Sequence, residues 1–267
     1  MWMKFIRALS RSRIGIGVKK RKGYTVANNN PQVAQPRERR VVVVGLGGIG
    51  SWVVQALCPF LNFSEDTWTL VLVDGDEYEG EKNRTRQVFD EIGAKAEVQA
   101  GWVARKFPRL RVQAITQYIS ADGTENTYPV SESICSGDVV FSCLDNHKTR
   151  KMLADHCVRL RDMTLISGGN EYTDGNVQVF VRRQGQDLTC RLEKYHPELA
   201  QPSDKAPWEM SCEELAASSP QLIFTNLTAA TFMLNAFYAL EQKKFQWDKP
   251  EVYFDIMANA ATPRVRK

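Results

Sequence analysis

A glycine-rich turn near the start of the chain has the residue types and the spacing that phosphate binding requires. Four valines, residues 41–44, are followed by a G-x-G-x-x-G pattern with one further glycine inside it: Gly45, Gly47, Gly48 and Gly50. Four consecutive valines are typical of a buried parallel strand, and residues 51–57 indicate a helix. Glycines at such a turn permit a tight bend and let a phosphate approach the free amides of the helix. The turn predicts a nucleotide site but does not identify the reaction.

Polar residues that a dehydrogenase would not need follow the glycine turn. The apolar strand 69–73 ends in Asp74, at the position where a nucleotide ribose is usually bound. Five more polar residues follow along the chain: Asn83, Arg86, Gln87, Lys95 and Asp145. Taken singly, Lys95 is more simply a solvated residue on a helix, and Asp145 the cap of a helix near Lys148. Their joint order and spacing favour a shared site.

This ordered set resembles the ubiquitin-activating-enzyme-like superfamily, and within it the ThiF/MoeB-type adenylyltransferases. That family reads G-x-G-G-x-G, then D-x-D, N-x-x-R-Q and G-x-x-K-A, and after a further strand D-N with an arginine soon after it. The corresponding residues here keep that order: Gly45 to Gly50, Asp74 and Asp76, Asn83, Arg86 and Gln87, Gly93 to Ala96 in a shortened G-x-K-A, Asp145 and Asn146, and Arg150. The resemblance covers roughly residues 40–240, and the combination is far more specific than any one motif.

The resemblance implies ATP- and Mg²⁺-dependent adenylation of the C-terminal carboxylate of a ubiquitin-like or sulfur-carrier protein that ends in Gly-Gly. A carboxylate is a poor acylating agent because its leaving group would be oxide, whereas attached AMP is a good leaving group. The attacking carboxylate is already charged, so the site needs positioning and charge neutralisation and no general base. A small peptide is a nearby alternative substrate.

The resemblance also assigns roles to the polar residues. Arg86 and Lys95 would neutralise the charge that develops on the phosphates, arginine as a planar fork and lysine as a point charge. Asp145 would hold the Mg²⁺ ion. The remaining residues would bind the ribose or orient the nucleotide through hydrogen bonds: Asp74 for the ribose, and Asn83 with Gln87 for orientation.

Two features depart from the family pattern. Asp74 and Asn83 are nine residues apart, one more than in the bacterial relatives, so the intervening loop differs. The family also takes an arginine from the partner subunit, within an R-Y-x-R-Q-like segment that this chain lacks. Five arginines near the N-terminus are candidates to replace it: Arg11, Arg13, Arg37, Arg39 and Arg40.

Six cysteines are scattered along the chain without a C-x-x-C pair: Cys58, Cys135, Cys143, Cys157, Cys190 and Cys212. Several bacterial relatives hold a structural zinc with two such pairs, so no structural zinc is expected here. Scattered cysteines without a secretory signal predict reduced thiols in a cytoplasmic protein. Cys212 lies near the place where some relatives keep a cysteine that accepts the activated acyl group. A cysteine that only packs this loop is an equally supported alternative.

Alternating strands and helices are expected to position these residues. The strands are expected at 41–44, 70–73, 112–116 and 139–143, and the helices at 51–59, 94–106 and 148–160. This alternation predicts an α/β, Rossmann-like fold with a mostly parallel sheet and helices on both faces. Later strands at 165–167, 177–182 and 252–256, with a turn at 173–176, indicate an antiparallel extension in the second half. Residues 221–240 are uncharged and as long as a membrane span, but their Thr and Asn residues favour a buried helix.

The formal charge of +4 is unevenly distributed. Residues 1–40 hold 11 Lys and Arg against one acid, whereas residues 41–267 hold 24 against 30. We expect a basic, partly disordered N-terminal arm, residues 1–39, and one adenylation domain, residues 40–267, with a long crossover loop at 185–220. The arm would be the only part to bind nucleic acid, or it would help to hold an acidic carrier protein. By resemblance we expect a homodimer with residues 221–240 near the interface, and no membrane association.

Three other functions fit parts of the sequence. A tRNA threonylcarbamoyladenosine dehydratase of the same superfamily would share the G-S-W of residues 50–52, but its C-terminal part does not match from residue 185 onward. An NAD-dependent oxidoreductase would explain only the glycine turn and Asp74. An inactive scaffold of the same fold is disfavoured because the residues of the nucleotide site are all present.

Overall fold

The computed structural model describes residues 37–80, 87, 89–210 and 221–265. Asn83, Arg86 and Cys212 lie outside the described residues, as does the arm up to residue 36. The division of the chain at residue 39 therefore stays a prediction.

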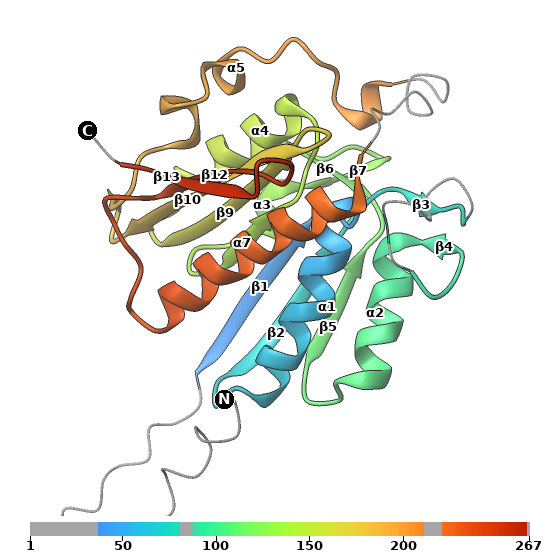
Figure 1. The fold of residues 1–267 in the computed structure, drawn as a ribbon. Helices are drawn as coiled ribbons and strands as arrows, with labels where there is room; N and C mark the ends of the chain where they lie inside the picture. The colour runs from blue at the N-terminus through green and yellow to red at the C-terminus, as the bar shows by residue number, and fades with distance from the viewer. Residues whose placement is uncertain (1–36, 81–86, 88, 211–220, 266–267) are drawn as a thin grey trace, which may run out of the picture. The chain divides into compact units, whose positions relative to one another are not determined.

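The described residues form one mixed sheet of nine strands (Figure 1). Its parallel part contains β5 (Arg111–Ile115), β2 (Thr67–Val73), β1 (Glu38–Val44), β8 (Val139–Ser142) and β9 (Met163–Asn170), in this spatial order. Antiparallel strands continue the sheet beyond β9: β10 (Asp174–Arg183), β12 (Glu251–Asp255) and β13 (Ala260–Arg264), with β11 (Gln186–Asp187) paired to β10. The predicted Rossmann-like sheet with an antiparallel extension is confirmed.

The valine run of β1 lies at the centre of this sheet, between β2 and β8. Val41 pairs in register with Leu70 on one side and Val139 on the other. Val41 and Val43 face one hydrophobic cluster while Val42 and Val44 face the other, as the two-residue period of a strand requires. All four are at most 2% exposed, and each buried valine side chain stabilises the fold by roughly 1.5–3 kcal/mol. A strand buried on both faces therefore carries the glycine turn.

Helices cover both faces of the sheet (Figure 1). One cluster contains α1 (Gly48–Phe63), α2 (Lys95–Lys106) and α7 (Ile223–Glu241), and the other contains α3 (Val130–Ser133) and α4 (His147–Cys157). Helices on both faces were expected from the alternating pattern. The observed elements differ from the expected ones mainly at their ends. Strand β1 begins at Glu38, before the valines, and helix α4 ends at Cys157.

Short elements connect the main ones. β3 (Glu77–Tyr78) pairs with β4 (Gly93–Ala94), and β6 (Tyr118–Ser120) pairs with β7 (Thr127–Pro129). The described part of the expected crossover loop contains β11 and single turns of helix: η3 (Leu192–Lys194), α5 (Pro197–Ala200) and η4 (Pro207–Glu209). This described part has no long element, in agreement with its three prolines, Pro197, Pro202 and Pro207.

The expectation that residues 221–240 form a buried helix is only half right. Helix α7 buries one face, which includes Ala229, Met233 and Phe237. The other face is open: Phe224 is 65% exposed and Tyr238 53% exposed. By length and composition alone α7 could cross a membrane, a test that core helices of soluble proteins also pass. The uncharged composition does not distinguish a helix buried on all sides from one that keeps an apolar face open.

Candidate nucleotide site

The glycine turn after β1 has the geometry that its glycines predict. Gly45 has a φ of +85°, and a Cβ there would lie 2.8 Å from the Cys143 carbonyl oxygen. A Cβ at Gly50 would lie 1.9 Å from the Gly45 carbonyl oxygen, so the turn closes too tightly for any side chain. Helix α1 then begins after Gly47 with no side-chain cap on its first amides. The helix N-terminus therefore presents N–H groups that can bind an anion.

Asp74 ties this turn to the end of β2. Its two carboxylate oxygens accept hydrogen bonds from the Leu46 amide at 2.5 Å and from the Asp76 amide at 2.8 Å. Burial raises the pKa of Asp74 to about 6, against the lowering effect of the Lys95 charge and with a further increase from Asp76. Asp74 therefore supports the glycine turn, and its role in ribose binding stays a prediction.

Lys95 is a buried cation at the start of α2. Its side chain is 5% exposed, and its Nζ lies 2.7 Å from Oδ2 of Asp76. The Lys95 amide also donates to the Asp76 carbonyl at 3.0 Å. The simpler interpretation of Lys95 as a solvated helix residue is therefore wrong. The second aspartate of the D-x-D motif holds this lysine on the side of α2 that faces the sheet.

Tyr118 belongs to this group although it is part of none of the sequence motifs. Its hydroxyl donates to Oδ1 of Asp76, and its ring packs so closely on Gly75 that a Cβ there would lie 2.6 Å away. Burial, and then the hydrogen bond to Asp76, raises the pKa of Tyr118, so it stays a donor at neutral pH. The available signal was its position three residues after the end of β5, at the same sheet edge as Asp74.

Asp145 and Asn146 follow β8, on the other side of β1. The helix cap is Asn146, whose side chain accepts from the Thr149 amide at 2.7 Å, so the interpretation of Asp145 as the cap is wrong. The Asp204 carboxylate takes the next two amides, His147 at 2.6 Å and Lys148 at 3.1 Å. Within the described parts of the chain, no hydrogen bond or ion pair engages the exposed Asp145 carboxylate. That carboxylate is therefore available to a cation.

The predicted residues meet at one edge of the sheet. The glycine turn follows β1, Asp74 follows β2 and Asp145 follows β8, and these three strands are parallel neighbours. Because the chain leaves β1 toward β2 and returns to β8 on the other side, this edge is the topological switch point where α/β sheets bind ligands. Gln87 is buried beside it, since a Cβ at Gly47 would lie 3.6 Å from Nε2 of Gln87.

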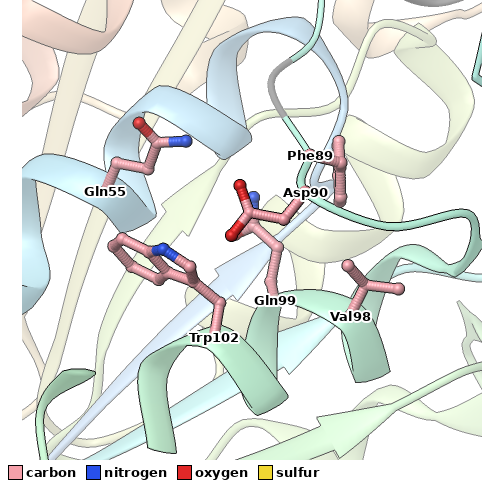
Figure 2. A pocket seen from close by; sticks show the side chains of 6 residues that line it. All are labelled: Gln55, Phe89, Asp90, Val98, Gln99 and Trp102. Atoms are coloured by element: carbon pink, nitrogen blue, oxygen red, sulfur yellow. The ribbon is translucent and has the colours of Figure 1, made fainter. Parts of the chain in front are cut away.

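Two cavities among the described residues lie away from this edge. A cavity of about 10 Å³ separates α1 from α2, and Figure 2 shows Gln55, Gln99 and Trp102 around it. Oε1 of Gln99 has no hydrogen-bond partner there, so the space suits about one water molecule. A larger cavity of about 270 Å³ lies between Arg39, Arg183 and Trp247, where β1 and β9 begin. Neither is lined by the residues of the predicted nucleotide site.

Residues 27–253 match the ThiF family. The SAMP-activating enzyme E1 of Haloferax volcanii is 32% identical over 146 residues, which are 53% of this chain and 49% of that protein. The tRNA threonylcarbamoyladenosine dehydratase of Haemophilus influenzae is 30% identical over 142 residues, which are 51% of this chain and 50% of that protein. The chain thus spans about half the length of these two relatives.

The fold is also similar to that of E. coli MccB, solved with AMPCPP and MccA. The TM-score is 0.60 with 18% sequence identity, over 85% of this chain and 63% of that one. At this identity the likeness concerns the fold alone. It agrees with the Rossmann-like strand order of this chain.

Proposed function

The chain belongs to the ThiF family, as its motif order predicted, and we propose that it uses ATP and Mg²⁺ to adenylate the C-terminal carboxylate of a ubiquitin-like or sulfur-carrier protein. The observation that carries this proposal is the pair of charges on either side of the glycine turn. Lys95 is buried beside Asp74 and Asp76, whereas Asp145 is exposed after the neighbouring strand β8 and has no hydrogen bond or ion pair among the described residues. This pair suits a triphosphate with its metal and has no role in hydride transfer.

In the proposed reaction a carboxylate oxygen attacks the α-phosphorus of ATP and forms the new P–O bond. The bond from that phosphorus to the bridging oxygen of the β-phosphate breaks, and pyrophosphate leaves with the electron pair. No proton has to move, so the protein contributes orientation and positive charge. The α1 amides would hold phosphate oxygens, and Lys95 would neutralise charge that develops on them. Arg86 would add a second cation.

Asp145 suits the proposed magnesium ion. Mg²⁺ at nucleotide sites is usually bound by one or two carboxylates together with phosphate oxygens and water. Among the described residues no group of three or more His, Cys, Asp and Glu side chains could hold a metal without the substrate. A bound Mg²⁺ would supply positive charge at the phosphates, while Asp145 anchors it to the end of β8.

Two other acceptors remain as proposals for this same site. A peptide carboxylate is supported by the MccA in the MccB structure. A tRNA base modified with threonylcarbamoyl is supported by the Haemophilus relative. We place the reaction in the cytoplasm, since the five described cysteines are free thiols and the sequence pattern favours reduced ones.

Pyrophosphate exchange tests the proposal directly. The purified chain is incubated with ATP, Mg²⁺ and labelled pyrophosphate, together with a carrier protein ending in Gly-Gly, a free peptide or threonylcarbamoylated tRNA. We expect exchange that depends on the carrier protein and on its free C-terminal carboxylate. Exchange supported only by the peptide or the tRNA would select one of the alternatives, and no exchange with any acceptor would reject the adenylation.

A further inference from the structure

Arg150 is a buried cation that forms no ion pair with any described residue. It projects from α4 and is 9% exposed. Its Nη2 donates to the Ser167 hydroxyl at 3.2 Å, and its Nε has no hydrogen-bond partner. No carboxylate among the described residues lies within 4.0 Å of the guanidinium. A buried charge that lacks a partner destabilises a fold by several kcal/mol, so some function has to account for it.

Other partly buried arginines of this chain do have carboxylate partners. Arg39 forms ion pairs with Asp66 and Glu241, and Arg182 forms one with Asp187. Two carboxylates, those of Glu198 and Asp145, lie near enough to raise the pKa of Arg150, but neither forms an ion pair with it. Glu198 of α5 affects the pKa of Arg150 but is bound by Nδ1 of His196 at 2.8 Å. Among the described residues the guanidinium therefore has no carboxylate in ion-pair contact, and an external anion could supply one.

Arg150 lies at the same sheet edge as the nucleotide site, one strand further along. Its guanidinium rests on Gly169 near the end of β9, where a Cβ would lie 2.8 Å from Nη1. Gly169 therefore makes the space in which the guanidinium lies flat against the strand. Burial lowers the pKa of Arg150, whereas the nearby charges of Glu198 and Asp145 raise it, and an arginine remains cationic throughout.

The order of strands gives this cation a place in the reaction. Along the edge, Asp74 follows β2, the glycine turn follows β1, Asp145 follows β8, and Arg150 packs over β9. Relative to a nucleotide with its ribose at β2 and its phosphates at β1, Arg150 would lie two strands beyond the phosphates, where it could hold an acceptor.

We propose that Arg150 binds the carboxylate of the acceptor and presents it to the α-phosphorus. This inference rests on the proposed adenylation and names the residue that recognises its acyl substrate. The planar guanidinium suits a carboxylate because it can donate two parallel hydrogen bonds. A nucleotide phosphate shares the oxyanion chemistry, and the experiment has to separate the two sources.

Thermal unfolding in different anions provides the test. Wild type, Arg150→Gln, Arg150→Met and Arg150→Lys are melted at constant ionic strength in chloride, acetate or phosphate. We expect acetate to raise the Tm of the wild type by about 2–4 °C relative to chloride. A ligand whose concentration is roughly four times its Kd would give a shift of this size. Arg150→Gln and Arg150→Met should lose this shift, and Arg150→Lys should keep part of it. Either neutral variant suffices if the other fails to fold.

Arg182→Met is the matched control, since Arg182 also has an unpartnered Nε but has a carboxylate partner. It should lower the Tm in chloride and leave the acetate shift unchanged. Arg150→Met should raise the Tm in chloride, because it removes an uncompensated buried charge.

Each result supports or overturns the proposal. No acetate shift in the wild type, or equal shifts in all variants, would overturn it. An Arg150-dependent shift in phosphate but not in acetate would overturn the assignment to the acceptor and place a nucleotide phosphate at Arg150. The measurement needs neither ATP nor turnover, so its failure is distinct from a failure of pyrophosphate exchange, which would count against the adenylation itself.

Discussion

At the scale of single residues, Lys95 and Asp76 show how a polar motif acquires its geometry. The family pattern identified both positions, but their ion pair and the hydroxyl of Tyr118 appear only in the folded chain. Asp76 lies next to Asp74 in the sequence pattern and yet has a different partner. Asp74 accepts backbone amides, while Asp76 holds a cation. Substitutions at Lys95 and Asp74 test these two roles, and a substitution at Cys212 tests the transfer step.

Lys95→Ala should remove most of the pyrophosphate exchange without unfolding the protein. Loss of one preorganised charge at a transition state typically costs on the order of 100-fold or more in rate. The same loss is expected for Arg86→Ala. Lys106→Ala in the last turn of the same helix α2 is the control, and its exchange rate should match the wild type. Near-normal exchange by both Lys95→Ala and Arg86→Ala would reject their assigned roles.

The raised pKa of Asp74 predicts a pH dependence of stability. Between about pH 4 and pH 6 the folded chain retains a proton on Asp74 that the unfolded chain releases. The contribution of Asp74 to the free energy of unfolding therefore falls as the pH rises through this window, by up to about 1.4 kcal/mol per pH unit. Urea unfolding of the wild type and Asp74→Asn at several pH values measures this effect. The advantage of wild type over variant should shrink toward pH 6, and a constant difference would contradict the prediction.

We propose that Cys212 accepts the activated acyl group as a thioester. A cysteine in this role has to approach the adenylate after pyrophosphate has left, form the thioester bond and release AMP, and loop movements serve such steps in other enzymes. Cys212→Ala should still form the adenylate but should lose a reductant-sensitive adduct with the carrier on gels. Cys190→Ala is the control, because Cys190 is buried and burial raises the pKa of its thiol. A wild type that forms the adenylate but never the adduct would make Cys212 structural.

At the scale of elements, α7 presents an uncharged face that the fold leaves open. Its exposed residues recur every three or four positions: Phe224, Leu227, Thr231, Asn235 and Tyr238. Helix α1 lies alongside α7 and exposes Phe60 and Phe63. The Phe60 and Tyr238 rings meet edge to face, with 6.0 Å between their centroids. An apolar surface built from two neighbouring helices is typical of a protein interface.

We expect this face to form a homodimer, and charged substitutions on it should produce monomers. Leu227→Arg and Tyr238→Glu each place a charge in the proposed interface, where it would be buried without a partner. Analytical ultracentrifugation at micromolar concentration measures the change. Met257→Glu is the control, because Met257 is 77% exposed in the turn after β12 and belongs to neither helix. A monomeric wild type with full activity would refute the dimer.

At the scale of the whole molecule, the sheet edge favours a triphosphate over a dinucleotide. Calorimetric titration should show that ATP with Mg²⁺ binds and that NAD binds far more weakly. The physical reason is the pair formed by Lys95 and Asp145, which matches phosphates and their metal. Asp145→Asn should weaken ATP binding in Mg²⁺ but have little effect on AMP binding without metal. Tight NAD binding in the absence of ATP binding would refute the adenylation proposal.

Much of the fold was predictable from local patterns, because those patterns have local physical causes. Consecutive valines require a strand buried on both faces, and the glycines at 45 and 50 are required by a turn that excludes side chains. The alternation of strands and helices indicated a parallel sheet, and the ordered motifs identified the family. These inferences depend on neighbours in the chain, which a sequence displays directly.

Only the tertiary structure decided which side chains are buried and which meet. Lys95 and Asp76 are 19 residues apart, and Tyr118 and Asp76 are 42 apart, so their contacts depend on how β2, β5 and α2 come together. The open face of α7 likewise depends on what packs beside it and could not be read from its uncharged composition. Arg150 looked like one more motif residue, and its lack of an ion pair with the described residues became visible only when α4 was placed over β9. Burial and pairing across strands arise from packing between distant segments. For that reason the sequence determined the type of site, while the fold determined which of its charged side chains are buried and which are paired.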